Sequence, residues 1–466
     1  MMSETTQTSA STCDNATFLN DDLVTDARYL VREVARRLRE PDGVEAIVER
    51  DSNREPVYGG SMWAGGSLSH GLAGTAMLYS VLSDSDGSFR DVARVHLNGA
   101  VRQLRWNKHA GVMGGACGVL ASAQQAGADG RSYRILRRKL TEFVVNSQDE
   151  LLRQYRGLVD EGLPWSAHDI INGLAGRLRV LLDEPSSKAE DMVQRTVVYL
   201  LEHVLTTRDD GLPGWWAPSE SQPTEVDRNT YTHGDLNLGL AHGVPGVVAS
   251  LVSVAERTGV ESDVRDAIGL ATDWIRSWRQ DDGEKQYWPA RVPAEYELHR
   301  DAAPSLLTRA AWCYGTPGVA VTVMRVGKLL QRSGLVSDGV CTLLSHLDIP
   351  DRDWHLDGPT FCHGYAGVIY VLYRCWLLTG DARLRALGNR LGKRLIYDMS
   401  DFDAPFVFRH WVPDSPAGWR DARSYRRLDG AGILEGGAGV ALVLDAVSNS
   451  RPRGLHPEWD RVVGLV

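Results

Sequence analysis

A thiol and an imidazole stand side by side at Cys362 and His363, two residues and one residue before a glycine. A second cysteine, Cys313, lies at the same distance before another glycine, in the sequence Trp-Cys-Tyr-Gly. Thiolate sulfur and imidazole nitrogen are ligands that suit Zn²⁺. Three protein ligands are typical of a catalytic zinc site, because a fourth position stays open. These residues therefore predict a zinc site formed by Cys313, Cys362 and His363.

The same cysteines have a simpler interpretation as small buried core residues. Free cysteine is among the most buried side chains in proteins. No CxxC spacing supports metal binding at Cys313 or Cys362. The interpretation as ligands therefore depends on where the rest of the chain places them.

The elements that must position these residues come from an internal repeat. Pairs of glycines three residues apart open an apolar helical stretch seven times, at Gly71/Gly74, Gly115/Gly118, Gly173/Gly176, Gly243/Gly246, Gly315/Gly318, Gly364/Gly367 and Gly436/Gly439. Between the pairs lie amphipathic stretches such as residues 382–398, with leucines on one side and Arg and Lys on the other. Each repeat thus predicts an apolar inner helix followed by a half-polar outer helix. Close packing between helices would explain most of the glycines.

Helix pairs of this kind cannot bury their apolar faces singly and must stack on one another. Because the inner helices need cover on all sides, we expect a closed double ring. The predicted fold is all-α, an α/α toroid of about seven inner and seven outer helices. An open helical solenoid or a barrel of the glycoside-hydrolase type would show the same periodicity, so the repeat alone does not decide the function.

The repeat also aligns the residues that are capable of chemistry. The position before the first glycine of each pair holds, in chain order, His70, Gly114, Asn172, His242, Tyr314, His363 and Glu435. One position earlier stand Ser69, Met113, Ile171, Ala241, Cys313, Cys362 and Leu434. In a ring these corners meet at one mouth, where the inner helices begin and point free N–H groups. The two cysteines would then lie in neighbouring repeats, with His242 in the repeat before them.

The chain divides into a short lead-in and one long repeat domain. Residues 1–20 are rich in Ser and Thr and have neither a basic segment nor an apolar core, so we expect a disordered lead-in and not a signal peptide. Residues 21–466 would form the toroid, starting with a helical pattern over 21–50. Stretches 208–237, 281–303 and 402–430 combine aromatic residues with Pro or Gly. They predict irregular or small β-containing insertions, which would serve as lids or binding walls and would suit a peptide chain.

Composition restricts the partners and the compartment. The 466 residues carry a net charge of -9 without a long basic run, which argues against a nucleic-acid partner. Six cysteines in a chain this long do not make a disulfide framework and fit a reducing compartment. No run approaches the roughly 18 apolar residues that a transmembrane segment needs. A cytoplasmic protein is expected.

The motifs are specific enough to name a family. The sequences Trp-Cys-Tyr-Gly around Cys313, Cys-His-Gly at Cys362 and Ala-His-Gly around His242, in a seven-fold glycine-paired repeat, resemble the lanthionine synthetase C-like cyclases. The resemblance covers about residues 66–447 and leaves no room for a fused kinase or dehydratase domain, so it implies the stand-alone class I type. Such enzymes are zinc-dependent and add cysteine thiols of a dehydrated precursor peptide to dehydroalanine or dehydrobutyrine, forming thioether rings. The implied partners are that peptide and, in a complex at the membrane, a dehydratase and a transporter.

The resemblance also assigns roles by match of motif. Cys313, Cys362 and His363 would be the zinc ligands. His242 would be the acid/base histidine, and Tyr314 the tyrosine beside the first ligand.

Two further residues match the family less directly. Asp169 falls where the family has an active-site aspartate, and Arg309, four residues before Cys313, matches its active-site arginine. His70 and Glu435 occupy equivalent repeat positions but receive no catalytic role.

The chemistry fits these residues independently. A free thiol has a pKa of about 8.5 and is mostly protonated at neutral pH, whereas a thiol that coordinates zinc is deprotonated. Attack on the β-carbon of a dehydro residue creates an enolate, which Arg309 or helix N–H groups would stabilise and which needs a proton at Cα. Histidine is a common acid/base group in enzymes, so His242 would supply it. Asp169 would orient the acid/base group, or would serve only as a helix N-cap or salt-bridge partner.

Three other functions would use some of the same residues. A glutathione-binding or glutathione-transferring member of the family would share the zinc site. A non-catalytic scaffold would hold a peptide through zinc, with His242 as a fourth ligand that closes the site. A metal-free hydrolase would use two carboxylates such as Asp169 and Glu435. That last alternative leaves the Cys/Cys/His group without a purpose, and the peptide cyclase is the favoured interpretation.

Overall fold

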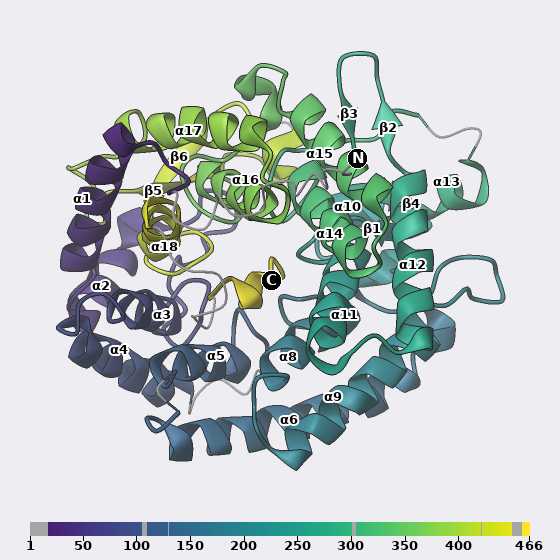
Figure 1. Ribbon diagram of the computed structural model, residues 1–466, viewed down its shortest axis with the longest axis horizontal. Coiled ribbons are helices and arrows are strands. Elements are labelled where there is room, and N and C mark those ends of the chain that lie inside the picture. Colours follow the sequence, from purple (N-terminus) through teal and green to yellow (C-terminus); the bar gives the residue numbers. More distant parts are fainter. Residues whose placement is uncertain (1–16, 105–109, 129, 301–303, 421, 450–458) are drawn as a thin grey trace, which may run out of the picture.

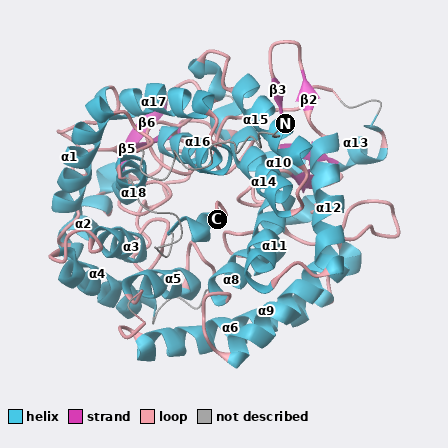
Figure 2. Cartoon of the chain, in the orientation of Figure 1, coloured by secondary structure: helices cyan, strands magenta, loops and turns pink. Residues whose placement is uncertain are grey.

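The structure, a computed structural model, describes residues 17–104, 110–128, 130–300, 304–420, 422–449 and 459–466. The described residues form two concentric rings of α-helices (Figure 1; Figure 2). Strands are confined there to three two-stranded sheets. The prediction of an α/α toroid with small β-containing parts is confirmed.

The inner ring consists of seven helices: α3 (Leu72–Leu82), α5 (Ala116–Ala126), α8 (Leu174–Leu181), α11 (Val244–Thr258), α14 (Thr316–Leu329), α16 (Tyr365–Thr379) and α18 (Gly437–Ser448). Each packs against the next, and α18 packs against α3, which closes the ring. Every residue of α3 and of α8 is buried. Cover on all sides is the reason why residues on every face of these helices are buried, and not only those along one stripe.

The outer ring also consists of seven helices: α1 (Asp21–Arg37), α4 (Phe89–Leu104), α6 (Arg134–Arg156), α9 (Ser187–Tyr199), α12 (Ser262–Ser277), α15 (Ser333–His346) and α17 (Ala382–Tyr397). Six of them follow their inner partner in the chain. The seventh pair differs from the expected order, because α1 packs against α18, the last inner helix (Figure 1). The two ends of the repeat array are thus joined by a contact between the start and the end of the chain.

Shorter elements connect these helices. They include α2 (Pro41–Val48), α7 (Trp165–His168), α10 (Glu225–Thr230), α13 (Ala294–Leu298) and short 3₁₀ or π turns at Asp51–Asn53, Val159–Glu161, Leu200–Val204, Ser219–Ser221, Asp351–Trp354, Gly418–Arg420 and Trp459–Val463. The antiparallel strand pairs are β1 (Asp235–Asn237) with β4 (Arg291–Pro293), β2 (Gln280–Asp281) with β3 (Gln286–Tyr287), and β5 (Arg409–Pro413) with β6 (Tyr425–Asp429). The strands lie within or beside the stretches 208–237, 281–303 and 402–430.

The glycine pairs have a local structural reason. The second glycine of each pair lies in the first turn of an inner helix, where the preceding loop crosses the helix. A Cβ on Gly118 or Gly367 would come within 2.1 Å of the carbonyl oxygen of Val112 or Phe361. The carbonyl six residues earlier blocks this space in all seven repeats. The requirement comes from a contact within each repeat more than from the packing between helices that the sequence pattern indicated.

Backbone hydrogen bonds join the loops before the inner helices into a circle. The N–H of Cys313 donates to the carbonyl of Cys362 (3.3 Å), and the N–H of Cys362 donates to that of Leu434 (2.9 Å). Equivalent bonds run from Leu434 to Ser69, Ser69 to Met113, Met113 to Ile171, Ile170 to Ala241 and Ala241 to Cys313. This circle is the physical reason why equivalent corners of the repeats meet at one mouth, as the alignment of the repeats predicts.

The start of the described chain differs from the predicted disordered lead-in. Phe18 and Leu19 are buried. The ring of Phe18 packs 5.4 Å from that of Tyr373, and the N–H of Leu19 donates to the carbonyl of Val447 (3.0 Å). Apolar side chains in an otherwise polar stretch thus fix residues 17–20 to the helices that they reach. Residues 1–16 of the predicted lead-in lie outside the described residues.

The last described residues, 459–466, lie at the centre of the ring (Figure 1). The indole of Trp312 donates to the carbonyl of Val463 (3.1 Å), and the hydroxyl of Ser253 donates to that of Val466 (2.9 Å). Side chains of the inner helices and their loops therefore hold the C-terminal segment in place. Among the described residues, no helix combines the length and the apolar character that crossing a membrane requires.

Candidate metal centre and active site

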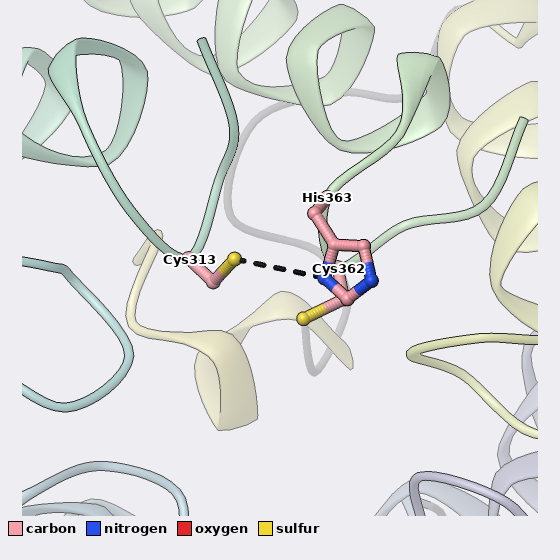
Figure 3. Close-up of side chains that lie close together, drawn as sticks. All are labelled: Cys313, Cys362 and His363. Atoms are coloured by element: carbon pink, nitrogen blue, oxygen red, sulfur yellow. Dashed lines mark hydrogen bonds between the residues drawn. The ribbon is translucent and has the colours of Figure 1, made fainter. Parts of the chain in front are cut away.

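Cys313, Cys362 and His363 point toward one another at the mouth of the ring (Figure 3). Cys313 comes from the loop before α14, and the other two come from the loop before α16. Their ligand atoms all lie within 4.8 Å of one another, and Sγ of Cys313 is 3.9 Å from Nδ1 of His363. Tetrahedral zinc with ordinary bond lengths holds sulfur and nitrogen about 3.6 Å apart. The donor set and its spacing therefore fit a zinc ion.

The electrostatics of this group favour a cation. Burial raises the pKa of the Cys313 thiol, but hydrogen bonds with Cys362 and His363 outweigh burial and hold that pKa well below its usual value. The pKa of Cys362 is raised, first by its hydrogen bond with Cys313 and then by burial. Burial lowers the pKa of His363, whereas its contact with Cys313 raises it, and the net change is a rise. Zinc binding would require Cys313 and Cys362 as thiolates and His363 as a neutral imidazole, so it would displace protons from this group.

His242 is held by a carboxylate on the neighbouring repeat. Its Nδ1 lies 2.6 Å from Oδ2 of Asp169, and since a carboxylate only accepts, Nδ1 carries the proton. The other oxygen of Asp169 accepts the backbone N–H groups of Ile171, Asn172 and Gly173 at 2.7 to 3.1 Å. Asp169 therefore both holds the loop that leads into α8 and orients His242, which leaves Nε2 of the imidazole available.

Tyr314 follows Cys313 directly in the chain and lies beside His242. The N–H of Ala241 donates to the carbonyl of Cys313 (3.2 Å), so the two loops run side by side. The ring of Tyr314 lies 6.1 Å from the ring of His242. Burial raises the pKa of the Tyr314 phenol, and its oxygen accepts the amide of Asn237 (3.3 Å). The phenol therefore keeps its proton at neutral pH.

Arg309 lies next to the metal group and is buried. Its Nη2 donates to the carbonyl of His355 (2.6 Å) and pairs with Oδ2 of Asp357 (3.0 Å). The same carboxylate oxygen lies 3.6 Å from Nε2 of His363. Nε of Arg309 is buried and has no hydrogen-bond partner among the described residues, so it is the nitrogen left for another ligand.

A second polar cluster, which the sequence pattern does not predict as a group, faces His363. Oε2 of Glu435 lies 2.7 Å from Nε2 of His70, and Oε1 lies 3.8 Å from Nε2 of His363. His410 of β5 packs its ring 5.3 Å from the ring of His363. The pKa of Glu435 is lowered, because the nearby histidines outweigh the effect of burial, which raises it. Burial lowers the pKa of His410 to about 4.

Only part of this cluster has a signal in the sequence. His70 and Glu435 share the position before the glycine in repeats one and seven, which meet because the ring closes. His410 and Asp357 lie at no repeat position, and their approach to the site depends on the fold of the loops.

Comparison with known proteins agrees with this architecture. The family described as "Lanthionine synthetase C-like protein" matches residues 62–460. This chain belongs to that family. Its resemblance to these proteins is thereby confirmed.

Two similar proteins carry names from one biosynthetic system. The nisin biosynthesis protein NisC of Lactococcus lactis subsp. lactis is 26% identical over 312 residues, which are 66% of this chain and 72% of that protein. Among solved structures, nisin cyclase matches with a TM-score of 0.73 and 21% identity, over 96% of this chain and 98% of that one. The second match shows that this family member shares the fold of nisin cyclase.

Proposed function

We propose that this chain is a zinc-dependent lanthipeptide cyclase. It adds cysteine thiols of a dehydrated precursor peptide to dehydroalanine and dehydrobutyrine, and so forms lanthionine and methyllanthionine rings. The observation that carries the proposal is the meeting of Cys313, Cys362 and His363 in the loop circle that also holds the His242–Asp169 pair. Sequence similarity to the nisin biosynthesis protein NisC supports the same reaction class.

Cys313, Cys362 and His363 are the residues that would hold the zinc. When bound, the ion supplies Lewis acidity that lowers the pKa of a substrate thiol. The carboxylates of Asp357 and Glu435 face Nε2 of His363 at 3.6 and 3.8 Å, so they favour the orientation in which Nδ1 points at the two sulfurs.

His242 delivers a proton to Cα, and the proton that the substrate thiol loses on becoming a thiolate balances it, so the addition consumes no proton overall. Addition of a thiolate to the β-carbon leaves an enolate, and the reaction ends when Cα receives a proton. Asp169 fixes Nδ1 of His242, so Nε2 is the atom that transfers the proton. Three backbone N–H groups hold Asp169 in turn, so the imidazole keeps its orientation through the reaction.

Arg309 and Tyr314 are the remaining donors for the enolate oxygen. Nε of Arg309 is buried and has no partner among the described residues, so a hydrogen bond to substrate would satisfy it. The phenol of Tyr314 is protonated at neutral pH, because burial raises its pKa. Either group would stabilise the developing negative charge.

The geometry favours an open metal site over a closed structural one. Nδ1 of His242 is engaged with Asp169, and in the part of the chain that the structure describes the group around Cys313 contains three ligands. The carboxylates of Asp169 and Glu435 each serve a histidine, so neither of the two acids named for the hydrolase alternative is free.

The reaction also defines the partners. A thiol can add only after a serine or threonine has been dehydrated, so a dehydratase must act on the peptide first. A transporter for the product is the other proposed partner. A reducing compartment such as the cytoplasm keeps the substrate thiols free, and the five described cysteines are free thiols as well.

The test uses the zinc-loaded chain and a peptide with one cysteine and one chemically dehydrated serine. Ring closure leaves the mass unchanged, so the remaining thiols are counted over time by alkylation and mass spectrometry. We expect thiols to disappear faster with the chain than without it, and the Cys362→Ala variant to give only the uncatalysed rate. Equal rates with and without the chain would refute the proposal. Addition of glutathione to the peptide in place of ring closure would favour the glutathione-transferring alternative.

A further inference from the structure

A cleft of about 430 Å³ opens beside Tyr314. All three insertions contribute to its lining: Tyr231 from the first, Glu295 from the second and Trp419 from the third. Its size is typical of a ligand site. Since all three insertions line this one cavity, the cleft is the place to look for their purpose.

Aromatic rings and a paired cation form one side of the cleft, which we call its floor. The guanidinium of Arg291 lies 4.3 Å from the ring centre of Trp165 and 3.6 Å from that of Tyr231. It donates to the carboxylates of Asp235 and Asp227, both at 2.8 Å. The buried cation is thus already satisfied, and the floor offers aromatic surface and no free positive charge.

The walls expose apolar surface. Leu307 lines the cleft and is 59% exposed, and Trp419 lines it from the third insertion. Trp419 packs against Arg309, with the guanidinium 5.3 Å from its ring centre. An apolar side chain of a ligand that covered Leu307 and Trp419 would remove this surface from water.

One carboxylate in the wall, that of Glu295, has no ion-pair partner in the part of the chain that the structure describes. Oε2 of Glu295 is buried and has no hydrogen-bond partner among the described residues. The other charged groups of the cleft pair with each other, since Arg420 lies 3.4 Å from Asp227, which Arg291 also contacts. A buried oxygen without a donor is costly, so a ligand that brings a cation or an N–H group to Glu295 would be favoured.

The cleft is continuous with the proposed active site. Tyr314 lines it and follows Cys313 directly in the chain. Trp165, also in the lining, has its ring 5.9 Å from that of His242. A peptide whose reacting residue lies between the metal group and His242 therefore has its next residues at the entrance of this cleft.

We propose that this cleft is a specificity subsite for the residues that flank the reacting residue of the peptide substrate. It binds an apolar side chain against Leu307 and Trp419, and a lysine or arginine side chain at Glu295. The proposal rests on the proposed cyclase function, because it takes the occupant to be the substrate peptide.

Binding is tested with peptides that cannot form a ring. Each fluorescein-labelled peptide carries one cysteine and has alanine in place of the dehydro residue. The pair of residues next to the cysteine is Phe-Lys, Ser-Lys or Phe-Gln. Separate peptides place this pair before or after the cysteine. Anisotropy with the zinc-loaded full chain gives each Kd. On one side of the cysteine, we expect Phe-Lys to bind ~10-fold more tightly than Ser-Lys and about 3-fold more tightly than Phe-Gln.

Three variants assign these preferences to the cleft. Leu307→Ser should remove the preference for Phe and keep that for Lys, whereas Glu295→Gln should do the reverse. Leu270→Ser changes a leucine that is 72% exposed on α12, outside the cleft, and should change neither preference. Equal affinity for all peptides, or preferences that survive both cleft variants, would overturn the proposal.

Ring closure is measured in parallel with the dehydrated forms of the same peptides. Selective binding without ring closure refutes the cyclase function and, with it, the identity of the occupant as substrate. Ring closure without selective binding refutes only the subsite. The two failures are therefore distinguishable.

Discussion

Asp169 shows how one side chain can serve both the fold and the chemistry. From the sequence it could be a helix cap, a salt-bridge partner or a group that orients an acid/base residue. One of its oxygens accepts three N–H groups of the loop that leads into α8, and the other accepts Nδ1–H of His242. The alternatives are not exclusive, because a carboxylate has two oxygens and can accept on both.

At this scale the first prediction concerns the metal. The zinc-loaded chain should hold about one zinc ion, since the described residues contain one Cys/Cys/His group. Cys362→Ala should lose the metal, because it removes one of three ligands. The matched control is Cys375→Ala, whose thiol is buried in α16 and whose pKa burial raises. It should keep the metal. Elemental analysis checks both variants, and full zinc occupancy in Cys362→Ala would show that the ligand assignment is wrong.

The individual residues were predictable where the repeat places them. Cys313, Cys362 and His242 stand at equivalent or adjacent repeat positions, so the alignment of the repeats brings them to one mouth. Asp357 and His410 have no such signal, because their contact with His363 depends on a loop and a strand outside the repeat.

At the scale of elements, the loop that crosses each inner helix explains why the second glycine of each pair recurs in all seven repeats. It also predicts that a side chain at the second glycine of a pair would lower the stability of the fold. Gly118→Ala would place Cβ 2.1 Å from the carbonyl oxygen of Val112, so the loop or the helix must shift. We expect a loss of roughly 3 kcal/mol in the free energy of unfolding. Urea denaturation at neutral pH measures this free energy. Gly118 is chosen because its repeat holds none of the proposed metal ligands.

The matched control for that prediction is Gly269→Ala on α12. No atom lies within 4 Å of the Cβ that it would add, so the change should stabilise by about 0.5–1 kcal/mol through helix propensity. Similar effects of the two substitutions would contradict the explanation of the glycine pairs.

The elements themselves were predictable to different degrees. Inner and outer helices differ in their apolar pattern, and this difference follows from burial on all sides or on one. The pairing of α1 with α18 was not predictable from the pattern. The other inner and outer helices follow each other in the chain, so the sequence indicates that they pair, whereas α1 and α18 lie at opposite ends of the repeat array. The burial of Phe18 and Leu19 depends on the same contact between distant parts of the chain. The strands of the insertions are two to five residues long, too short for a clear alternation.

At the scale of the whole molecule, the closed rings bury a histidine that is not part of the proposed site. His346 of α15 is buried, and neither ring nitrogen has a hydrogen-bond partner among the described residues. Burial lowers its pKa to about 3. Between about pH 6.5 and pH 3 the unfolded chain therefore binds a proton that the folded chain does not, and stability falls as the pH falls through this window.

This effect predicts a change in the pH dependence of stability. His346→Leu removes the titrating group, so the loss of unfolding free energy between pH 7 and pH 5 should be about 2 kcal/mol smaller than in the unchanged chain. Urea denaturation at both pH values measures the difference. Cys341→Ser, an exposed change on the same helix, should keep the original pH dependence. The same loss in His346→Leu and in the unchanged chain would contradict the role given to His346.

The central claim is a division of labour in which one group holds the metal and His242 moves the proton. Zinc content and the rate of thiol loss from a dehydrated peptide, measured on the same samples of His242→Ala and His363→Ala, test it most directly. His242→Ala should keep about one zinc ion and close rings ~10²–10⁴-fold more slowly, because a positioned acid/base group is missing. His363→Ala should lose metal and activity together. Loss of zinc from His242→Ala would make His242 a fourth ligand of a closed site, and a full rate in that variant would place the proton donor elsewhere; either result contradicts the account.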